Sequence, residues 1–438
     1  MTLKRLIRSH LCPLFLIVAM MPLAACGASM RQEVRAAPPP QQVAALPPPV
    51  EAPPPAPPPK PDKYYGEHIT KVGLLLPLSG PNAALGEAMR DAAQLALFDV
   101  GDPTIVLLPR DTEWSGGAAG AAQDAIDDGA QVLLGPIFAD AIRAAGPVAQ
   151  QFSVPLIGFS TDRTVAGNGV YIMGFTPQQQ VDRIVKYAID QGYKRLAALV
   201  PESAYGTMVV EALRSAAGRY GGTVVDTETF QPNEAALADP VERLSRHRVE
   251  IAPPPDASPP PAMPGEPPAE PQPVYKYDFD AVLIAAGGGL LKTLAPMLPY
   301  YDIDPDKVKF LGTGLWDDAS LKSEHELAGA WYAGPPPQAG TTFTQRFQTV
   351  YGETAPRVST IAYDAVSLVA ALKKLRPERP FSREALTSPT GFSGIDGVFR
   401  FGPDGVADRG LAVVQINPSG ADVVDLAPQE FGTSYAQP

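Results

Sequence analysis

Short apolar runs and amphipathic stretches alternate along the chain from Ile69 onward. The apolar runs have the length of strands, and most of them lack the polar alternation of a strand that has one face in water. Such runs are typical of strands that are covered on both faces, as in parallel sheets. The predicted strands lie at 72–76, 105–108, 132–134, 155–157, 196–200, 223–225, 281–285 and 308–311.

Helical periodicity fills several of the segments between these runs. An apolar stripe with the spacing of one helix face extends from Val181 to Ile189 and stops at Gly192. A second helix is predicted after Gly86, and its apolar face holds Met89, Ala93, Ala96 and Val100. Repeated alternation of strand and helix predicts an α/β fold with mainly parallel sheets flanked by helices. The predicted folded region, 67–420, is too long for one core, so we expect two lobes.

The first residues have the pattern of a secretory signal peptide, which we predict to occupy residues 1–25. Basic residues at 4, 5 and 8 precede an apolar run at 11–21, and small residues lie before Cys26. The apolar run is about half of the ~20 residues that a membrane-spanning helix needs. We therefore expect this segment to be removed rather than to anchor the protein.

Residues 23–26, Leu-Ala-Ala-Cys, resemble the bacterial lipobox, in which cleavage precedes a cysteine that carries diacylglycerol. The resemblance implies lipidation of Cys26, and the alternative is a chance cysteine near an ordinary cleavage site. Gly27 follows, where an aspartate would resemble an inner-membrane retention signal. We therefore expect a protein that is held by acyl chains on the periplasmic side of the outer membrane.

Many of the 51 prolines of the chain fall in two blocks. The first makes residues 26–66 a Pro-rich segment, which we interpret as a polyproline tether, or alternatively as a docking ligand for a partner domain. The second block, 253–273, interrupts the folded region. It suits neither a helix nor a central strand, so we interpret it as a surface insertion.

The chain is acidic overall, with a formal net charge of -12 over 438 residues. Nucleic acid is not an expected partner, because phosphate binding needs clustered Lys and Arg. The chain has two cysteines, and Cys12 lies in the segment that is predicted to be removed. With Cys26 consumed by lipid, no disulfide is expected, and the fold must be stabilised by its core.

The residue patterns of common enzyme sites are weak or missing in the sequence. The four histidines have no metal-ligand spacing, and no Gly-x-Ser-x-Gly motif occurs. The glycines at 287–289 lack the Lys-Ser/Thr of a phosphate loop. Asp317 and Asp318 could serve acid–base chemistry, but two solvated acids at the start of a helix are the simpler interpretation. We therefore predict no catalytic residue, no metal, no cofactor and no enzyme activity.

Several motifs, in order, resemble the type I periplasmic binding proteins, and among them the branched-chain amino-acid receptors. They include VGLLLPLSGP at 72–81, ALGEAMR at 84–90, Asp-Thr at 111–112, QVLLGP at 131–136, VPLI at 154–157, AYG at 204–206, YDAV at 363–366, GIDG at 394–397 and FGPDG at 401–405. The resemblance implies a two-lobed type I periplasmic-binding fold.

By that resemblance the chain crosses between lobes near Phe175, Trp316 and Pro389. Lobe one would hold about 69–176 and 317–389, and lobe two about 177–316 and 390–420, followed by a C-terminal tail at 421–438. Ligands of such folds bind between the lobes, at the carboxyl ends of the strands. The insertion at 253–273 precedes the strand at 279–285, so we expect it at the opposite, amino end.

The resemblance also gives candidate cleft residues, which are Ser79, Ser160, Thr161, Asp162, Tyr205 and Trp316. For Ser79, capping of the next helix is an equal alternative, and Tyr205 could equally pack on its own lobe. A zwitterionic amino acid needs both of its charges paired. However, residues 137–140 lack the family's serines, Asp162 would repel a carboxylate, and 287–290 offer no acid for an ammonium group. We therefore expect the cleft to have lost amino-acid recognition.

A second resemblance is to the penicillin-binding protein activator lipoproteins. It rests on FLGTGLWDD at 310–318, LAGAWYA at 327–333 and the loop FSTDR at 159–163. It implies that a peptidoglycan synthase is the partner and that the protein activates this synthase. The better-known members carry a helical-repeat domain where this chain has the Pro-rich segment, which puts the choice of partner in doubt. The alternative function is a substrate-binding protein of an ABC importer, with an amino acid or another small molecule in the cleft.

Overall fold

The computed structural model describes residues 69–251 and 274–432. It divides into the units Met1–Pro59 and Lys60–Pro438, and all described residues lie in the second. The predicted signal peptide, Cys26, the whole Pro-rich segment 26–66 and the insertion at 253–273 lie outside the described residues, so these interpretations remain predictions. Among the described residues, no helix combines the length and the apolar character that crossing a membrane requires.

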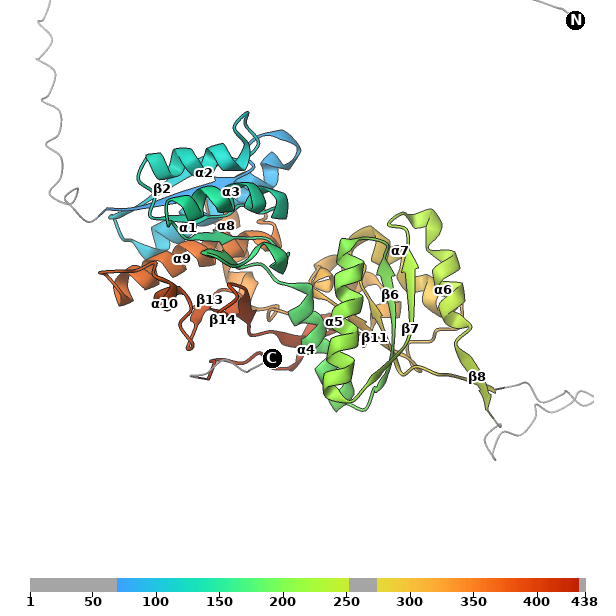
Figure 1. Ribbon diagram of the computed structural model, residues 1–438. Coiled ribbons are helices and arrows are strands. Elements are labelled where there is room, and N and C mark those ends of the chain that lie inside the picture. The colour runs from blue at the N-terminus through green and yellow to red at the C-terminus, as the bar shows by residue number, and fades with distance from the viewer. Residues whose placement is uncertain (1–68, 252–273, 433–438) are drawn as a thin grey trace, which may run out of the picture. The chain divides into compact units, whose positions relative to one another are not determined.

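The first sheet is parallel and has the strand order β2-β1-β3-β4-β5. We call this sheet, together with the helices that cover it, lobe one. Its strands are β1 (Thr70–Leu76), β2 (Ile105–Asp111), β3 (Val132–Leu134), β4 (Leu156–Gly158) and β5 (Val170–Ile172). One face packs on α2 (Gly117–Asp127) and α3 (Ala139–Gln151). The other face packs on α1 (Ala83–Val100), α8 (Ala339–Tyr351) and α9 (Thr360–Leu375) (Figure 1).

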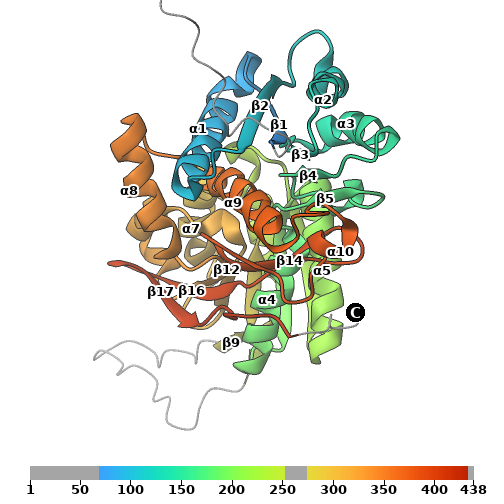
Figure 2. The same cartoon turned by 90° about the vertical axis from the view of Figure 1, so that its left-hand side faces the viewer.

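The second sheet, with its covering helices, forms lobe two and has the order β17-β16-β12-β11-β10-β6-β7. Its parallel part contains β6 (Arg195–Pro201), β7 (Thr223–Phe230), β10 (Ala281–Ile284), β11 (Lys309–Gly312) and β12 (Trp331–Gly334). The antiparallel strands β16 (Ala412–Asn417) and β17 (Gly420–Asp425) form one edge of this sheet beside β12 (Figure 2). One face is covered by α4 (Pro177–Asp190) and α5 (Ala204–Tyr220), and the other by α6 (Ala238–Ser245) and α7 (Gly288–Tyr300).

Two smaller antiparallel pieces complete the fold. One is the sheet of β13 (Phe392–Gly394), β14 (Gly397–Phe401) and β15 (Ala407–Arg409), whose apolar residues join the core of lobe one. The other is a ribbon of β8 (Arg248–Ile251) and β9 (Val274–Tyr277), from which the insertion departs. The remaining helices are α10 (Arg383–Leu386) and the 3-10 turns η1 (Gly80–Asn82), η2 (Arg163–Val165), η3 (Glu234–Ala236), η4 (Gly314–Trp316), η5 (Ala319–Ser323), η6 (His325–Leu327) and η7 (Arg357–Ser359).

The structure confirms the α/β fold class, the predicted strands and both predicted helices. Every apolar run that was interpreted as a strand coincides with β1, β2, β3, β4, β6, β7, β10 or β11, and the helices are α4 and α1. The amphipathic pattern was informative because a stripe of small and branched residues on each helix packs into a buried core. In α4 that stripe, from Val181 to Ile189, is at most 6% exposed.

The boundaries between the lobes differ from the sequence prediction at two places. The chain was expected to return to lobe one near Trp316, but β12 hydrogen-bonds in the sheet of lobe two, so the return follows Gly334. It was then expected to leave lobe one near Pro389, but Phe399 and Phe401 pack in the core of lobe one, so the final crossing follows Arg409. The C-terminal tail also begins later than 421, because β17 occupies Gly420–Asp425.

The insertion joins the fold at the predicted end of the sheet. The strand β9 ends at Tyr277, directly before β10, so the ribbon meets lobe two at the amino end of β10. Carboxyl ends of the parallel strands, where ligands of such sheets bind, lie at the other edge. The attachment point is therefore remote from the cleft edge.

Candidate functional site

A cavity of about 360 Å³ lies where the carboxyl ends of the two sheets face one another. Lobe one contributes the loop after β4, the start of η7 and α9, and part of the crossing segment that leads to α4. Lobe two contributes the starts of α4 and α5 and the turn after β11. The lining residues are Phe159, Thr161, Phe175, Pro177, Gln180, Tyr205, Gly314, Leu315, Asp317, Pro335, Arg357, Val358 and Ile361.

Two of the six candidates from the sequence, Thr161 and Tyr205, line this cavity. Tyr205 begins α5, which is capped by Ser203 through a hydrogen bond from the amide of Gly206. Its hydroxyl lies 2.9 Å from the hydroxyl of Thr313, and burial raises the pKa of the phenol. Tyr205 therefore both packs on its own lobe and faces the cavity, so the two interpretations of this residue are compatible.

Ser160 and Asp162 are engaged with their own loop. The hydroxyl of Ser160 accepts a hydrogen bond of 3.0 Å from the amide of Asp162. The carboxylate of Asp162 accepts from the amide of Thr164 and forms an ion pair of 2.7 Å with Arg143. Burial alone would raise the pKa of Asp162, but the hydrogen bonds from Thr164 and the charge of Arg143 outweigh it and lower the pKa. The sequence led us to expect that Asp162 would repel a ligand carboxylate. Because Arg143 already pairs with the charge of Asp162, this carboxylate is not free to do so.

Ser79 and Trp316 also have structural contacts. Ser79 is exposed at the end of β1, and its hydroxyl hydrogen-bonds the carboxylate of Asp111, which also accepts from the amide of Leu78 at 2.9 Å. Trp316 is 1% exposed and donates its indole N–H to the carbonyl of Ala286 at 2.9 Å. Its ring packs against Gly312, where an added Cβ would come within 2.1 Å of the indole. Trp316 is thus a core residue of lobe two.

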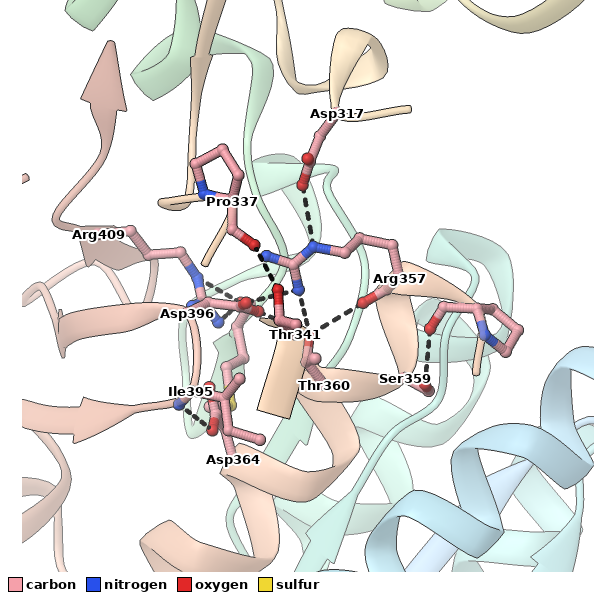
Figure 3. Close-up of polar contacts among 12 residues, drawn as sticks. Asp317, Pro337, Thr341, Arg357, Ser359, Thr360, Asp364, Ile395, Asp396 and Arg409 are labelled. Carbon is pink, nitrogen blue, oxygen red and sulfur yellow. Dashed lines mark hydrogen bonds and ion pairs between the residues drawn. The ribbon is translucent and has the colours of Figure 1, made fainter. Parts of the chain in front are cut away.

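Arg357 is the cation of the cavity wall, and the sequence analysis did not identify it. It lies in η7 of lobe one, and its Nε donates to Asp317 of the lobe-two turn at 2.9 Å. Its Nη1 lies 2.6 Å from the carboxylate of Asp396 and 3.2 Å from the hydroxyl of Thr360. Figure 3 shows the guanidinium between Asp317 on one side and Asp396 with Thr360 on the other. The guanidinium therefore links lobe one to lobe two through Asp317, and it is held within lobe one by Asp396.

Asp317 is consequently not the solvated acid that the sequence suggested. Its side chain is 19% exposed, and besides Arg357 it contacts the hydroxyl of Tyr332 at 3.5 Å. Burial, and then the negative charge of Asp317, raise the pKa of Tyr332. Asp318 does begin a helical turn, because its carboxylate accepts from the amide of Ser320 at 2.8 Å. The helix-start interpretation is correct for Asp318 alone.

Two more buried ionisable side chains, Asp364 and Arg409, lie behind Arg357. Asp364 of α9 accepts from the amide of Ile395 at 2.7 Å, and its other oxygen has no hydrogen-bond partner among the described residues. Arg409 of β15 donates to the carbonyl of Met173 at 3.0 and 2.6 Å. Burial, and then the charge of Asp396, raise the pKa of Asp364 to about 7. Burial lowers the pKa of Arg409.

Replacing Asp364 by asparagine should therefore flatten the pH dependence of stability. The unfolded chain releases the Asp364 proton near pH 4, but the folded protein keeps it until about pH 7. Between these values the folded state binds more protons, so the wild-type protein loses stability as pH rises, and the loss persists above pH 7. One pKa unit corresponds to about 1.4 kcal/mol, so Asp364→Asn should be the more stable protein at alkaline pH by at least about 1 kcal/mol.

Urea unfolding between acid and alkaline pH measures this difference. Asp140→Asn is the matched control, since the side chain of Asp140 is 97% exposed and its removal should leave the pH profile unchanged. An Asp364→Asn protein that loses stability with rising pH as steeply as the wild type would contradict the argument.

The described residues contain no group of three or more His, Cys, Asp or Glu side chains that is placed to hold a metal ion. The cavity wall has one carboxylate, which is tied to Arg357. The arrangement can enclose a small molecule between two lobes and can couple the lobes through Arg357. A nucleophile paired with a base is not among the lining residues.

Curated relatives carry two kinds of name. The chain is 24% identical over 340 residues to "Penicillin-binding protein activator LpoA" of Vibrio vulnificus, covering 74% of this chain and 54% of that protein. It is 27% identical over 188 residues to "Leu/Ile/Val-binding protein homolog 6" of Brucella abortus, covering 39% of this chain and 48% of that protein. The chain thus spans about half the length of the curated relatives that it matches.

Solved structures show the same fold. The ABC transporter substrate-binding protein from Sphaerobacter thermophilus matches with a TM-score of 0.64 and 19% identity, over 83% of this chain and 99% of that one. A solute binding protein from Rhodopseudomonas palustris, solved in complex with benzoate, matches with a TM-score of 0.57 and 17% identity, over 83% and 97%. A family model described as "Periplasmic binding protein" matches residues 70–421. On this match and the two-lobed fold, the chain belongs to the periplasmic binding protein family.

Proposed function

We propose that the protein is an envelope lipoprotein that binds a peptidoglycan synthase and activates it, and that it does not deliver amino acids to an importer. The support from relatives is that two Vibrio activators align with 74% and 70% of this chain, whereas the Brucella binding-protein homologue aligns with 39%. The part of the activators that this chain matches is about half of their length, so the synthase as partner is a proposal.

The observation that carries the proposal is the state of the charges in the cavity. A zwitterion held between the lobes needs one cation for its carboxylate and one anion for its ammonium group. The charged residues of the lining are Arg357 and Asp317, and they pair with one another. A bound amino acid would have to break this ion pair before its own charges could be paired, which makes its binding less favourable.

The proposed location follows from the fold and from the start of the sequence. The periplasmic binding fold and the activator relatives favour the periplasm. Lipid attachment at Cys26 would hold the protein on the outer membrane, and the Pro-rich segment 26–66 would let the lobes reach inward to a synthase. On this proposal the protein is no enzyme and needs no cofactor, and it acts through contact with its partner.

The proposal predicts that the purified protein raises the rate at which a bifunctional penicillin-binding protein from the same cell polymerises glycan strands. The rate should saturate with added protein, as expected for a binding equilibrium. The matched control is the Brucella homologue, which is named as a binding protein and resembles this chain over part of its length. A polymerisation rate that stays unchanged up to high protein concentration would contradict the proposal.

A receptor function is the alternative, and the cavity together with the ABC-transporter neighbours favours it. A receptor should be stabilised by its solute by RT ln(1 + [L]/Kd), which is about 2.7 kcal/mol at a hundredfold excess over Kd. Thermal unfolding with each amino acid distinguishes the functions. A shift of several degrees with one amino acid, without any effect on the synthase, would favour the receptor.

A further inference from the structure

We infer that the cavity between the lobes binds an uncharged, mainly apolar molecule with a single aromatic ring. A carboxylate or an amino acid should bind less well. The inference concerns the cavity alone and is independent of the synthase as partner.

The cavity wall is mainly apolar. Rings and branched side chains from both lobes supply most of it, namely Phe159, Phe175, Pro177, Leu315, Pro335, Val358 and Ile361. A volume of about 360 Å³ suits a molecule with a single ring. Aromatic side chains such as Phe159 and Phe175 pack well against another ring, so a flat apolar ligand matches this wall.

The charges in and behind the wall disfavour an added anion. The guanidinium of Arg357 already has carboxylates on two sides, 2.9 Å away at Asp317 and 2.6 Å away at Asp396. A ligand carboxylate would be a third anion around one cation. Each close pair of like charges is unfavourable in a partly buried site. An added cation gains little, since Asp317 is already paired with Arg357.

The uncharged polar groups of the wall are also largely engaged. Gln180 accepts from the amide of Gly314 at 2.7 Å and donates to the carbonyl of Phe175 at 3.3 Å. The hydroxyl of Tyr205 contacts that of Thr313. The wall therefore offers few free polar groups to a ligand, which favours an apolar molecule.

Probes of equal shape and different charge test the inference. Benzamide, benzoate and benzylamine differ in one substituent, and L-leucine represents the zwitterions. Calorimetric titration of the full chain at neutral pH should give benzamide an affinity at least about tenfold above that of benzoate, benzylamine or leucine, a difference of 1.4 kcal/mol. Equal or tighter binding of benzoate or leucine would overturn the inference, and so would a lack of benzamide binding at millimolar concentration.

Two variants connect the preference to the wall. Asp317→Asn removes one of the two counter-charges of Arg357, so benzoate should gain at least about tenfold in affinity relative to benzamide. Asp318→Asn, at the neighbouring exposed acid outside this cavity, should change neither affinity. Leu315→Asp places a charge at a wall position that is 46% exposed and should weaken benzamide without unfolding the protein. An unchanged preference in Asp317→Asn, or unchanged benzamide binding in Leu315→Asp, would rule the assignment out.

The outcome is separable from the proposed function. The synthase assay is run without any probe, so stimulation of glycan polymerisation can succeed while no probe binds. Conversely, a preference for benzamide that inverts in Asp317→Asn would establish the ligand class even if the synthase did not respond.

Discussion

Arg357→Met should lower the free energy of unfolding by about 3 kcal/mol, because it leaves the fully buried carboxylate of Asp396 without its counter-charge. Asp396 has a side chain that is 0% exposed, and Asp317 is 19% exposed, so neither carboxylate can be solvated fully once the guanidinium is gone. Methionine keeps much of the length of the arginine side chain, which limits the contribution of an empty space. Urea unfolding at neutral pH measures the loss.

Arg346→Met is the control on the same lobe. Arg346 pairs with Asp99 at the surface and is 55% exposed, so its replacement should cost at most about 1 kcal/mol. If both variants lost the same free energy of unfolding, the ion pairs of Arg357 with Asp317 and Asp396 would contribute no more than a surface pair.

Trp316→Ala should destabilise the protein about as much as Arg357→Met. We expect the free energy of unfolding to fall by roughly 3–5 kcal/mol, which is typical when alanine replaces a large buried aromatic residue. The side chain is 1% exposed, and its indole N–H satisfies the carbonyl of Ala286. The ring also occupies the space beside Gly312. The variant therefore loses packing and leaves a buried carbonyl without its donor. Thermal or urea unfolding measures the cost.

Trp114→Ala provides the matched control for this loss. Trp114 lies in the loop before α2 and is 45% exposed, although its ring contacts the backbone near Gly116. Its replacement should change stability by less than about 1 kcal/mol, because little apolar surface is withdrawn from water there. If both tryptophans proved equally dispensable, Trp316 would not belong to the core of lobe two.

The sequence predicted the central strands well, because continuous apolar runs mark strands that are covered on both faces. It failed at the edges, where the signal is local and weak. The segment of β12, from Trp331 to Gly334, is short and follows a turn at Gly329, and it does not reveal which sheet it joins. The strands β13 to β15 are short and bend at glycines, and they pack into lobe one through Phe399 and Phe401. The crossings could not be located without these pairings.

For the site, the sequence identified the loops but not the interactions. Thr161 and Tyr205 were found because the resemblance to the type I periplasmic binding proteins placed their loops at the cleft. Arg357 was missed because its partners Asp317 and Asp396 lie 40 and 39 positions away, and nothing in the local sequence marks the pairing. A lone arginine beside the apolar residues Val358 and Ile361 was the one available signal. Asp162 was misjudged because its pairing with Arg143 is likewise non-local.

The pairing of β8 with β9 has a consequence for how this chain can change over generations. Ile251 and Val274 lie opposite each other in the antiparallel pair, so the chain ends on either side of the insertion are held side by side. Lengthening a loop with fixed ends is inexpensive, at about 0.6 kcal/mol for each doubling. Insertion or loss of prolines between these points should therefore change the stability of the fold very little, and both sheets keep their structure.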